Sequence, residues 1–380
     1  MNVFCEISVG ETMAGIMVIN GGMLTTVQDE GRYGYQASGV QVSGVMDRTA
    51  ALLANALVGN DELSEAEDAA LLEATYLGPE LEFGQDALAA VAGGMPDVQL
   101  DGAPVPPYRA IAVKAGQRLK VAAQKSGLRA YIAVSGGFAT DRALGSRSTN
   151  LKLGLGGHLG RKLAAGDVLP VGEPGAYAAR ALAGRAGLRA VPEKFVETLI
   201  NKGVVTGADG GKIRQIRVIL GPQEDYFSRQ SIAAFAEAVY TVSNNSDRMG
   251  YRLQGAAVEK AKQQDLITDG IAFGSVQIPP DGQPIIMMAD HQTTGGYPKL
   301  ATVATVDLPL LAQSMPGDRL QFRLISVQEA QQLLRQQHEE LVQVIHQMKE
   351  QAVLMVHPAG AKQFRLTING EAFDVTIRQE

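Results

Sequence analysis

The amino-acid sequence predicts a mainly β protein with some α-helix, in which many tight corners suit barrel architecture. Short apolar and β-branched runs bounded by Gly, Pro or Asp recur roughly every ten to twenty residues, as at 88–92 and 131–134, which is typical of strands. The 380 residues include 43 Gly, so turns must be frequent. One turn that leads directly into a candidate strand returns at 115–119, 165–169 and 316–320. Such units close the corners of a β-barrel, and the lack of a fixed repeat period argues against a solenoid or a propeller.

Composition divides the chain into two strand-rich halves, residues 17–171 and 212–326. Between them, residues 172–211 mix Gly, Ala and charged residues without a strand pattern, so we interpret this segment as a connector. Hydrophobic residues make up 46% of the chain, which is enough to build a sizeable core.

Three helices are predicted. Asp47 is a suitable N-cap for a helix that is apolar on one face and ends at Gly59. A second helix is expected over residues 231–238. The third begins with a Ser-x-x-Glu capping box at 326–329, and apolar residues at helical spacing continue it over 327–352. Its other face is rich in Gln and Glu, so it either lies along the surface or pairs with another chain.

The tail, residues 353–380, contains two alternating runs around Asn369-Gly370. Asn-Gly between such runs predicts a hairpin with a type I′ turn. Because an isolated hairpin is only marginally stable, we expect it to pack on the body of the protein or on a partner.

Charge and cysteine content indicate in which cellular compartment the protein acts and which classes of binding partner are unfavourable. The chain has 40 Asp and Glu against 34 Lys and Arg, a net charge of -6, which argues against a nucleic-acid or anionic-membrane partner held by bulk electrostatics. The single Cys5 can form no internal disulfide, in keeping with a reducing cytosol. The first apolar run is too short for a membrane helix and lacks the basic start of a signal peptide, so we expect a cytoplasmic location.

Familiar catalytic motifs are missing from the sequence. It contains no P-loop, no zincin His-Glu-x-x-His and no Gly-x-Ser-x-Gly elbow. The five His do not cluster, so no metal site is expected. Residues 154–160 are the nearest approach to a dinucleotide fingerprint, but they lack a strand-to-helix context and are interpreted as a Gly-rich barrel corner.

Two polar segments in the first half are candidate anion sites. Ser43 and Asp47 lie at the start of a predicted helix, where free backbone N–H groups bind anions, although Asp47 has the alternative role of a plain N-cap. Arg147 and Ser148 lie in a stretch with one guanidinium and three hydroxyls, which suits a carboxylate or phosphate. An ordinary polar loop is the alternative there.

Residues 246–253 form a third segment. In an extended strand Arg248, Gly250 and Arg252 share one face, so two guanidiniums flank a residue without a side chain and can line a pocket for an anionic ligand. The alternative is a half-buried edge strand.

Residues 289–299 are the most unusual segment. They place a carboxylate, an imidazole, an amide, two hydroxyls, a phenol and an ammonium around Gly295-Gly296, directly after an apolar strand. Loops this dense in polar groups on a rigid strand are typical of binding and catalytic sites, and an ordinary polar turn is the alternative.

These segments, in this order, resemble the biotin-dependent carboxyltransferase family. It includes the second subunit of allophanate hydrolase, the antagonist KipA, the carboxyltransferase part of urea carboxylase and the C subunit of bacterial 5-oxoprolinase. The matching stretches are TTVQDEGRYGYQASGVQVSGVMDRTAALLANALVGN, YIAVSGGFATDRALGSRSTNLKLGLGGHLGRKLAAGDVLP, SDRMGYRLQG and PPDGQPIIMMADHQTTGGYPKLATV. The resemblance implies two cyclophilin-like β-barrel subdomains over 17–171 and 212–326, preceded by a flexible leader over 1–16.

The resemblance also implies partners and a reaction. A smaller partner of the same superfamily, similar to KipI or to the B subunit of 5-oxoprolinase, is expected, with a third subunit that completes ring opening. For 5-oxoprolinase the cofactor is ATP, at a site shared with the partner. Two alternatives stay open: transfer of a carboxyl group from carboxybiotin, on a separate carrier, to urea or another small amide, and a regulator like KipA without turnover. The tail is similar to the opening hairpin of a biotinyl domain but contains no Met-Lys-Met.

Both enzymatic activities need cations to hold negative charge and polar groups to recognise an amide. We therefore predict catalytic roles for Asp290, Lys299 and Arg248, and substrate-binding roles for Ser43, Asp47, Arg147, Ser148, Gln292, Thr293 and Tyr297.

Overall fold

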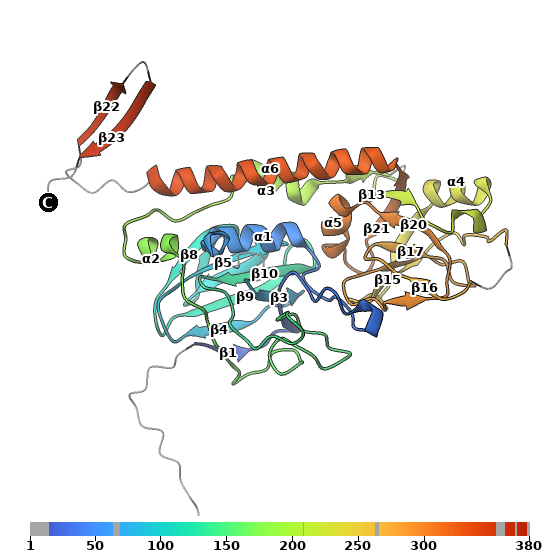
Figure 1. The fold of residues 1–380 in the computed structure, drawn as a ribbon, viewed down its shortest axis with the longest axis horizontal. Helices are drawn as coiled ribbons and strands as arrows, with labels where there is room; N and C mark the ends of the chain where they lie inside the picture. Colours follow the sequence, from blue (N-terminus) through green and yellow to red (C-terminus); the bar gives the residue numbers. More distant parts are fainter. Residues whose placement is uncertain are drawn as a thin grey trace, which may run out of the picture.

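The computed structural model describes residues 15–63, 69–207, 209–262, 266–354, 362–368 and 371–377. Two β-rich units lie side by side, and one long helix crosses both of them (Figure 1). The predicted fold class, mainly β with some α, is confirmed.

The first unit consists of two antiparallel sheets, with strand orders β11-β1-β4-β9-β6-β7 and β2-β3-β10-β5-β8. The strands are β1 (Ile16–Asn20), β2 (Leu24–Gln28), β3 (Leu71–Thr75), β4 (Glu80–Phe83), β5 (Ala87–Gly93), β6 (Pro96–Leu100), β7 (Ala103–Val105), β8 (Ala110–Val113), β9 (Arg118–Gln124), β10 (Arg129–Val134) and β11 (Val168–Leu169). Their inner faces share one core that includes Val18, Phe83, Leu119 and Ile132. The short strands predicted at 88–92 and 131–134 are both present, as β5 and β10.

The second unit is a closed barrel. Its strands follow the order β13-β20-β17-β18-β15-β14-β21, and a parallel pairing of β13 with β21 closes the ring. These strands are β13 (Lys212–Leu220), β14 (Val239–Val242), β15 (Gly250–Gln254), β17 (Ser275–Gln277), β18 (Ile285–Met287), β20 (Lys299–Val303) and β21 (Arg319–Leu324), with β12 (Val204–Thr206) added to β13. Phe235 and Phe322 stack in its core at 4.4 Å between ring centroids. The barrel predicted from the Gly-rich corners is therefore present.

The three predicted helices are confirmed. Helix α1 (Arg48–Leu57) begins at the N-cap Asp47, whose side chain accepts a hydrogen bond from Ala50 N. Helix α4 (Arg229–Glu237) occupies the position of the second prediction. Helix α6 (Val327–Leu354) begins after Ser326, whose hydroxyl oxygen accepts a hydrogen bond from the backbone N of Glu329. Its N-terminus agrees with the predicted capping box.

The connector between the units carries elements that the sequence pattern did not indicate. It contains α2 (Ala176–Leu182), α3 (Glu193–Asn201) and β12. The helices are short, and the Ala and Gly around them hide their periodicity, so packing rather than propensity decides their formation. Helix α5 (Leu308–Ala312), in the second unit, is a single short turn of the same kind.

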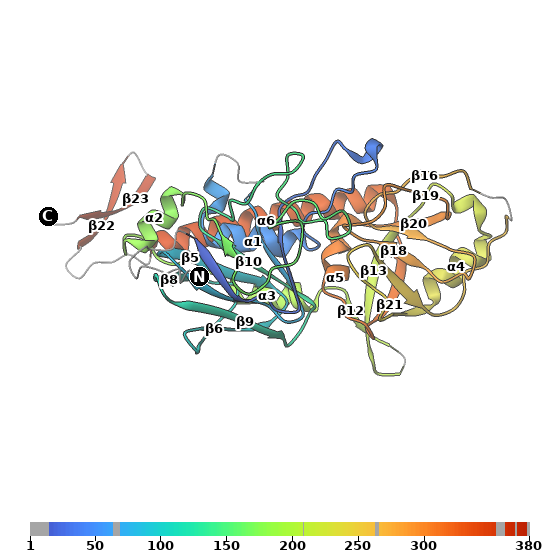
Figure 2. The same ribbon diagram turned by 90° about the horizontal axis from the view of Figure 1, so that it is seen from below.

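Helix α6 lies along the surface and spans both units (Figures 1 and 2). Leu341, Val344 and Met348 on its inner face are buried in a cluster with α1. Lys349 Nζ is 2.7 Å from Asp61 Oδ2 of the first unit. Of the two alternatives for this helix, the structure supports packing on the chain itself. No helix in the described ranges combines the length and apolar character needed to cross a bilayer.

In the tail, β22 (Lys362–Ile368) and β23 (Glu371–Ile377) pair antiparallel, with Ile368 opposite Glu371. The predicted hairpin is confirmed, while its turn at 369–370 lies outside the described residues. The predicted leader also falls largely outside them, and β1 already begins at Ile16.

Candidate functional site

Four buried charged side chains meet where the two units touch. Glu73 on β3 and Arg129 on β10 come from the first unit, and Arg248 and Asp290 come from the second. Arg248 Nε lies 2.8 Å from Asp290 Oδ2, and its Nη1 donates to Glu73 Oε1. Arg129 Nε is 3.6 Å from the same Glu73 oxygen. Two cations and two carboxylates thus balance in the interior, as buried charges require. We call these four residues the junction network.

The guanidinium of Arg248 is fully used by the protein. Besides its two carboxylate partners, its Nη2 donates to Gly44 O at 2.6 Å. The contact between Arg248 and Asp290 joins the third and fourth polar segments. With all its nitrogens engaged, Arg248 is suited to hold the site in place rather than to bind a ligand directly. The catalytic roles of these two residues stay predictions.

The predicted pocket between Arg248 and Arg252 is not formed. Arg248 precedes β15 and is buried in the junction network, whereas Arg252 lies within β15 and is exposed. The two guanidiniums therefore do not share one face, because the strand begins only at Gly250. Tyr251 and Leu253 are buried on the inner face, so the alternation expected of a half-buried strand is present.

Asp47 lies next to the junction network. Its carboxylate accepts from Ala50 N and from Gln313 Nε2, both at 2.9 Å. Its backbone N donates to the hydroxyl of Tyr131, which donates in turn to Glu73 Oε2. Burial, with the nearby negative charge of Glu73 adding to it, raises the pKa of Asp47 to about 6. Asp47 is therefore an N-cap and also a carboxyl group able to exchange a proton near neutral pH.

The first, second and fourth polar segments are joined by hydrogen bonds of Asn150 and Gln41. Asn150 Nδ2 donates to Ser43 Oγ at 3.1 Å and to Gln41 Oε1 at 2.6 Å. Gln41 Nε2 donates to the backbone oxygen of Asp290 at 2.8 Å. Ser43 adopts a φ of 59°, which is uncommon outside glycine and indicates a tightly determined turn. The fold thus brings together segments that are more than 100 residues apart in the chain.

Asp29 organises the loop that carries Arg147 and Ser148. Its carboxylate accepts from the hydroxyls of Ser146 and Ser148 and from the backbone N of Arg147. The Arg147 side chain turns back to Thr140 O, 2.9 Å from its Nε. Ser148 is fully buried, so the hydroxyls of this segment build the loop.

Arg32 is a buried cation beside this loop. Its Nε and Nη2 donate to the backbone oxygens of Ala143 and Ser148, while its Nη1 finds no hydrogen-bond partner among the described residues. Gly156 explains the tight packing, because a Cβ there would lie 2.2 Å from Ser148 O and 2.6 Å from Arg32 Nη2. Residues 154–160 form turns, in agreement with their interpretation as a Gly-rich corner.

Lys299 anchors the end of the fourth segment. Its side chain is buried, with Nζ 2.7 Å from Asp269 Oδ2 and 2.8 Å from Gly270 O. Asp269 and Gly270 form β16, which pairs with β19 (Thr294–Gly295) in the middle of the segment. Within the described ranges, no hydrogen bond or ion pair joins Lys299 to Asp290.

The other predicted residues of the fourth segment lie nearer the surface. Tyr297 is 44% exposed, and Gln292 and Thr293 are half-buried. His291 is buried, with its Nδ1 2.7 Å from Gln292 O, and burial lowers the pKa of its imidazole. In the part of the chain that the structure describes, no group of three or more His, Cys, Asp or Glu is arranged to hold a metal ion.

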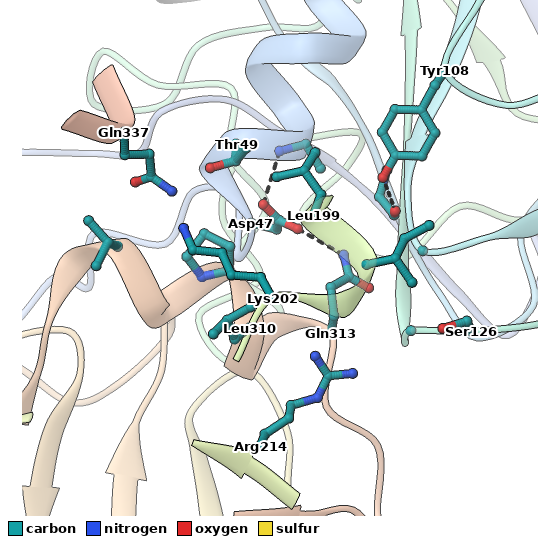
Figure 3. A pocket seen from close by; sticks show the side chains of 17 residues that line it. Asp47, Thr49, Tyr108, Ser126, Leu199, Lys202, Arg214, Leu310, Gln313 and Gln337 are labelled. Atoms are coloured by element: carbon teal, nitrogen blue, oxygen red, sulfur yellow. Dashed lines mark hydrogen bonds between the residues drawn. The ribbon is translucent and has the colours of Figure 1, made fainter. Parts of the chain in front are cut away.

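A cavity of about 50 Å³ opens beside Asp47, between the units (Figure 3). Asp47 and Gln313 form one side of it, while Lys202, directly after α3, and Arg214, on β13, approach it as well. The remaining wall comes from α1, α3, α5, α6 and two loops of the first unit. It includes Thr49, Tyr108, Ser126, Leu199, Leu310 and Gln337.

Sequence reasoning missed several residues that hold this site together. Glu73 carries a signal that was available, since it is a lone acid inside an apolar strand, where an unpaired charge is not tolerated. Asp29 and Arg32 lie inside a stretch that carries the family resemblance. Lys202 and Gln313 carry no local signal and are recognised only once the units are packed together.

Comparison with known proteins gives the family. Residues 38–324 match the family described as "Carboxyltransferase domain, subdomain A and B". The chain belongs to this carboxyltransferase family. Its match covers all four polar segments, and α6 and the tail follow it.

Two relatives in the carboxyltransferase family are bacterial proteins whose names identify them as the C subunit of 5-oxoprolinase. The protein from Haemophilus influenzae is 38% identical over 310 residues, which cover 82% of this chain and 91% of the relative. The protein from Escherichia coli is 37% identical over 315 residues, covering 83% and 93%. Their name marks them as parts of a larger enzyme.

A solved structure extends the comparison beyond the family core. The Kluyveromyces lactis urea carboxylase matches 98% of this chain and 33% of its own length, with a TM-score of 0.77 and 28% identity. The carboxyltransferase relatives thus include both an oxoprolinase component and part of a urea carboxylase.

Proposed function

We propose that this protein is the C subunit of an ATP-dependent 5-oxoprolinase. The observation that carries the proposal is the 37–38% identity to two proteins of that name over more than nine tenths of their length. In this proposal the chain acts in the cytoplasm with a smaller subunit of the same superfamily and activates 5-oxoproline for ring opening to glutamate. A third subunit completes the ring opening.

The chemistry of the site supports an amide substrate. Activation of an amide oxygen by phosphate from ATP creates negative charge, which nearby cations stabilise. Asp47, with its pKa raised to about 6, is suited to exchange a proton with the lactam. Gln292 and Tyr297 present hydrogen-bonding groups near the surface. The ATP site is proposed to be shared with the smaller subunit.

ATP hydrolysis tests the proposal. The chain, co-purified with its smaller subunit, is assayed with and without 5-oxoproline. We expect 5-oxoproline to stimulate hydrolysis, and we expect Lys299→Ala to lose that stimulation, while Lys120→Ala, an exposed lysine on β9, keeps it. Tyr297→Phe, at an exposed position, tests the fourth segment without risk to the core. Absence of stimulation in the wild-type complex would contradict the proposal.

A second candidate is carboxyl transfer from carboxybiotin to urea or another small amide. The observation that favours it is the structural match to a urea carboxylase, which spans 98% of this chain and so reaches α6 and the tail. Loss of the carboxyl group from free carboxybiotin in the presence of urea would support it. If the complex shows no activity in either assay, a KipA-like regulatory role is favoured instead.

A further inference from the structure

The cavity beside Asp47 contains two cations that have no carboxylate of the described residues nearer than 4.0 Å. No carboxylate in the described ranges lies within 4.0 Å of Lys202 Nζ, and no hydrogen bond is formed there. Arg214 has one ionic contact, from Nε to Asp318 Oδ2 at 4.0 Å, and its guanidinium donates no hydrogen bond to any described residue. Both side chains nevertheless line the cavity rather than extend into open solvent (Figure 3).

Without a ligand, the partial burial of these two cations raises the free energy of the folded protein. Burial lowers the pKa of both Lys202 and Arg214, and the attraction of more distant acids, such as Asp307 for Lys202 and Asp318 for Arg214, offsets this only in part. By contrast Arg217, on the same strand as Arg214, makes two hydrogen bonds to the fully buried carboxylate of Asp307. Partly buried cations without a close acid are expected where a ligand supplies the negative charge.

On the opposite side of the cavity, hydrogen bonds hold the side chains of Gln313 and Asp47 in place. Gln313 Oε1 accepts from the backbone N of Leu128 and of Arg129, both at 3.0 Å, so its amide cannot rotate. Its Nε2 donates to Asp47 Oδ2 and orients that carboxyl group. A ligand held by the cations therefore meets a carboxyl group in a defined position.

Size and charge specify the ligand class. The cavity of about 50 Å³ holds a few water molecules or one small polar group, since one water needs roughly 10–15 Å³. Two cations and one carboxylate leave an excess of one positive charge when Asp47 is ionised. A nucleotide triphosphate is too large and too highly charged, whereas a single carboxylate group fits.

We infer that this cavity is a carboxylate-binding site, in which Lys202 and Arg214 hold the carboxylate of a small monocarboxylic acid and Asp47 faces the remainder of the molecule. The inference rests on the proposed function and deepens it, because 5-oxoproline carries one carboxylate on a lactam ring. It assigns the carboxylate to Lys202 and Arg214, and the lactam to the side of Asp47.

Calorimetric titration of the complex with its smaller subunit tests the inference. The probes are 5-oxoproline, 2-pyrrolidinone, which has the same ring without a carboxylate, and acetate and lactate as other monocarboxylates. We expect Lys202→Met and Arg214→Met each to weaken 5-oxoproline binding by about 10- to 100-fold, the loss of one charge-assisted hydrogen bond. Binding of 2-pyrrolidinone should be the same in all variants, and Lys202→Arg should retain most of the affinity.

Matched controls separate a binding defect from a folding defect. Lys120→Met and Arg252→Met remove exposed cations on β9 and β15 and should leave every affinity unchanged. Unfolding midpoints of all variants show whether the fold is intact. Equal affinity for 5-oxoproline in the wild type and in Lys202→Met and Arg214→Met would overturn the site, even if the complex hydrolyses ATP.

The same titrations distinguish the site from the proposed function. If 5-oxoproline does not bind but acetate or lactate does, and the two variants lose that binding, the carboxylate site stands and the oxoprolinase proposal fails. If no monocarboxylate binds the wild-type complex, the carboxylate site is overturned, and 5-oxoproline-stimulated ATP hydrolysis then decides the function alone.

Discussion

The junction network and the adjacent cavity each contain two basic side chains, but the protein treats the two pairs differently. In the junction, Arg129 and Arg248 face Glu73 and Asp290 at contact distance. In the cavity, the one ionic contact among the described residues is from Arg214 to Asp318, at 4.0 Å, and Lys202 has none. The comparison separates cations that hold the two units together from cations that are available to a ligand.

The junction should show the largest effect on stability. Arg248→Met leaves the buried carboxylate of Asp290 without its cation and leaves Glu73 with only the longer contact to Arg129, so we expect a loss of about 3–5 kcal/mol in the free energy of unfolding. Urea unfolding measures it. Arg252→Met, at an exposed position on β15, should change stability by less than about 0.5 kcal/mol. A loss below about 1 kcal/mol for Arg248→Met would remove the distinction between the two pairs.

Asp47 lies between the two regions and should give a pH-dependent effect of intermediate size. Its pKa is raised from an ordinary 3.8 to about 6, so the folded state holds a proton that the unfolded chain has already released. The contribution of Asp47 to the free energy of unfolding is therefore present in full below pH 4 and is lost as the pH rises through about 6. The expected loss is roughly 2–3 kcal/mol.

Unfolding of the wild type and of Asp47→Asn at pH 4, 5, 6 and 7 isolates that effect. The difference between the two proteins should change between pH 4 and about 7, most of it below pH 6, and then stay constant. The charged groups that face Asp47 are Glu73, Lys202 and Arg214, and the balance of their charges sets the size of the step. A difference that does not vary with pH would contradict the burial argument.

The cavity cations should have the smallest effect on stability. We expect Arg214→Met to change the free energy of unfolding by no more than about 1 kcal/mol in either direction, because no close partner is left unpaired. Arg217→Met, three positions along the same strand, removes the partner of buried Asp307 and should cost about 3 kcal/mol or more. Similar losses in the two variants would show that Arg214 is structural.

Features that depend on local chemistry could be predicted from the sequence. Asp47 was identified as an N-cap because a carboxylate directly before an apolar helical face can accept hydrogen bonds from the free N–H groups of the first turn. The long helix after Ser326 followed from its capping box, and the tail hairpin from Asn-Gly between alternating runs.

Contacts across the two units could not be predicted in this way. The sequence indicates a role for Arg248, but its partner Glu73 lies 175 positions away, and the link from Gln41 to Asp290 spans 249. The pairing of Asp47 with Gln313 spans 266. Such contacts depend on how the units pack, so neither residue type nor spacing encodes them. The roles predicted for Ser43, Arg147, Ser148 and the fourth segment stay predictions.

Helix α6 limits how the molecule can move. Its 28 residues correspond to about 42 Å of rigid rod, at 1.5 Å for each residue. One end follows directly from β21 of the second unit, and the other is held to the first unit by Met348 and by the pair Lys349–Asp61. A hinge rotation of one unit against the other would have to bend this helix or separate it from the buried apolar cluster that it shares with α1. Entry to the cavity is therefore expected to depend on local rearrangement of side chains such as Gln337 and Lys202, while the two units keep a fixed angle.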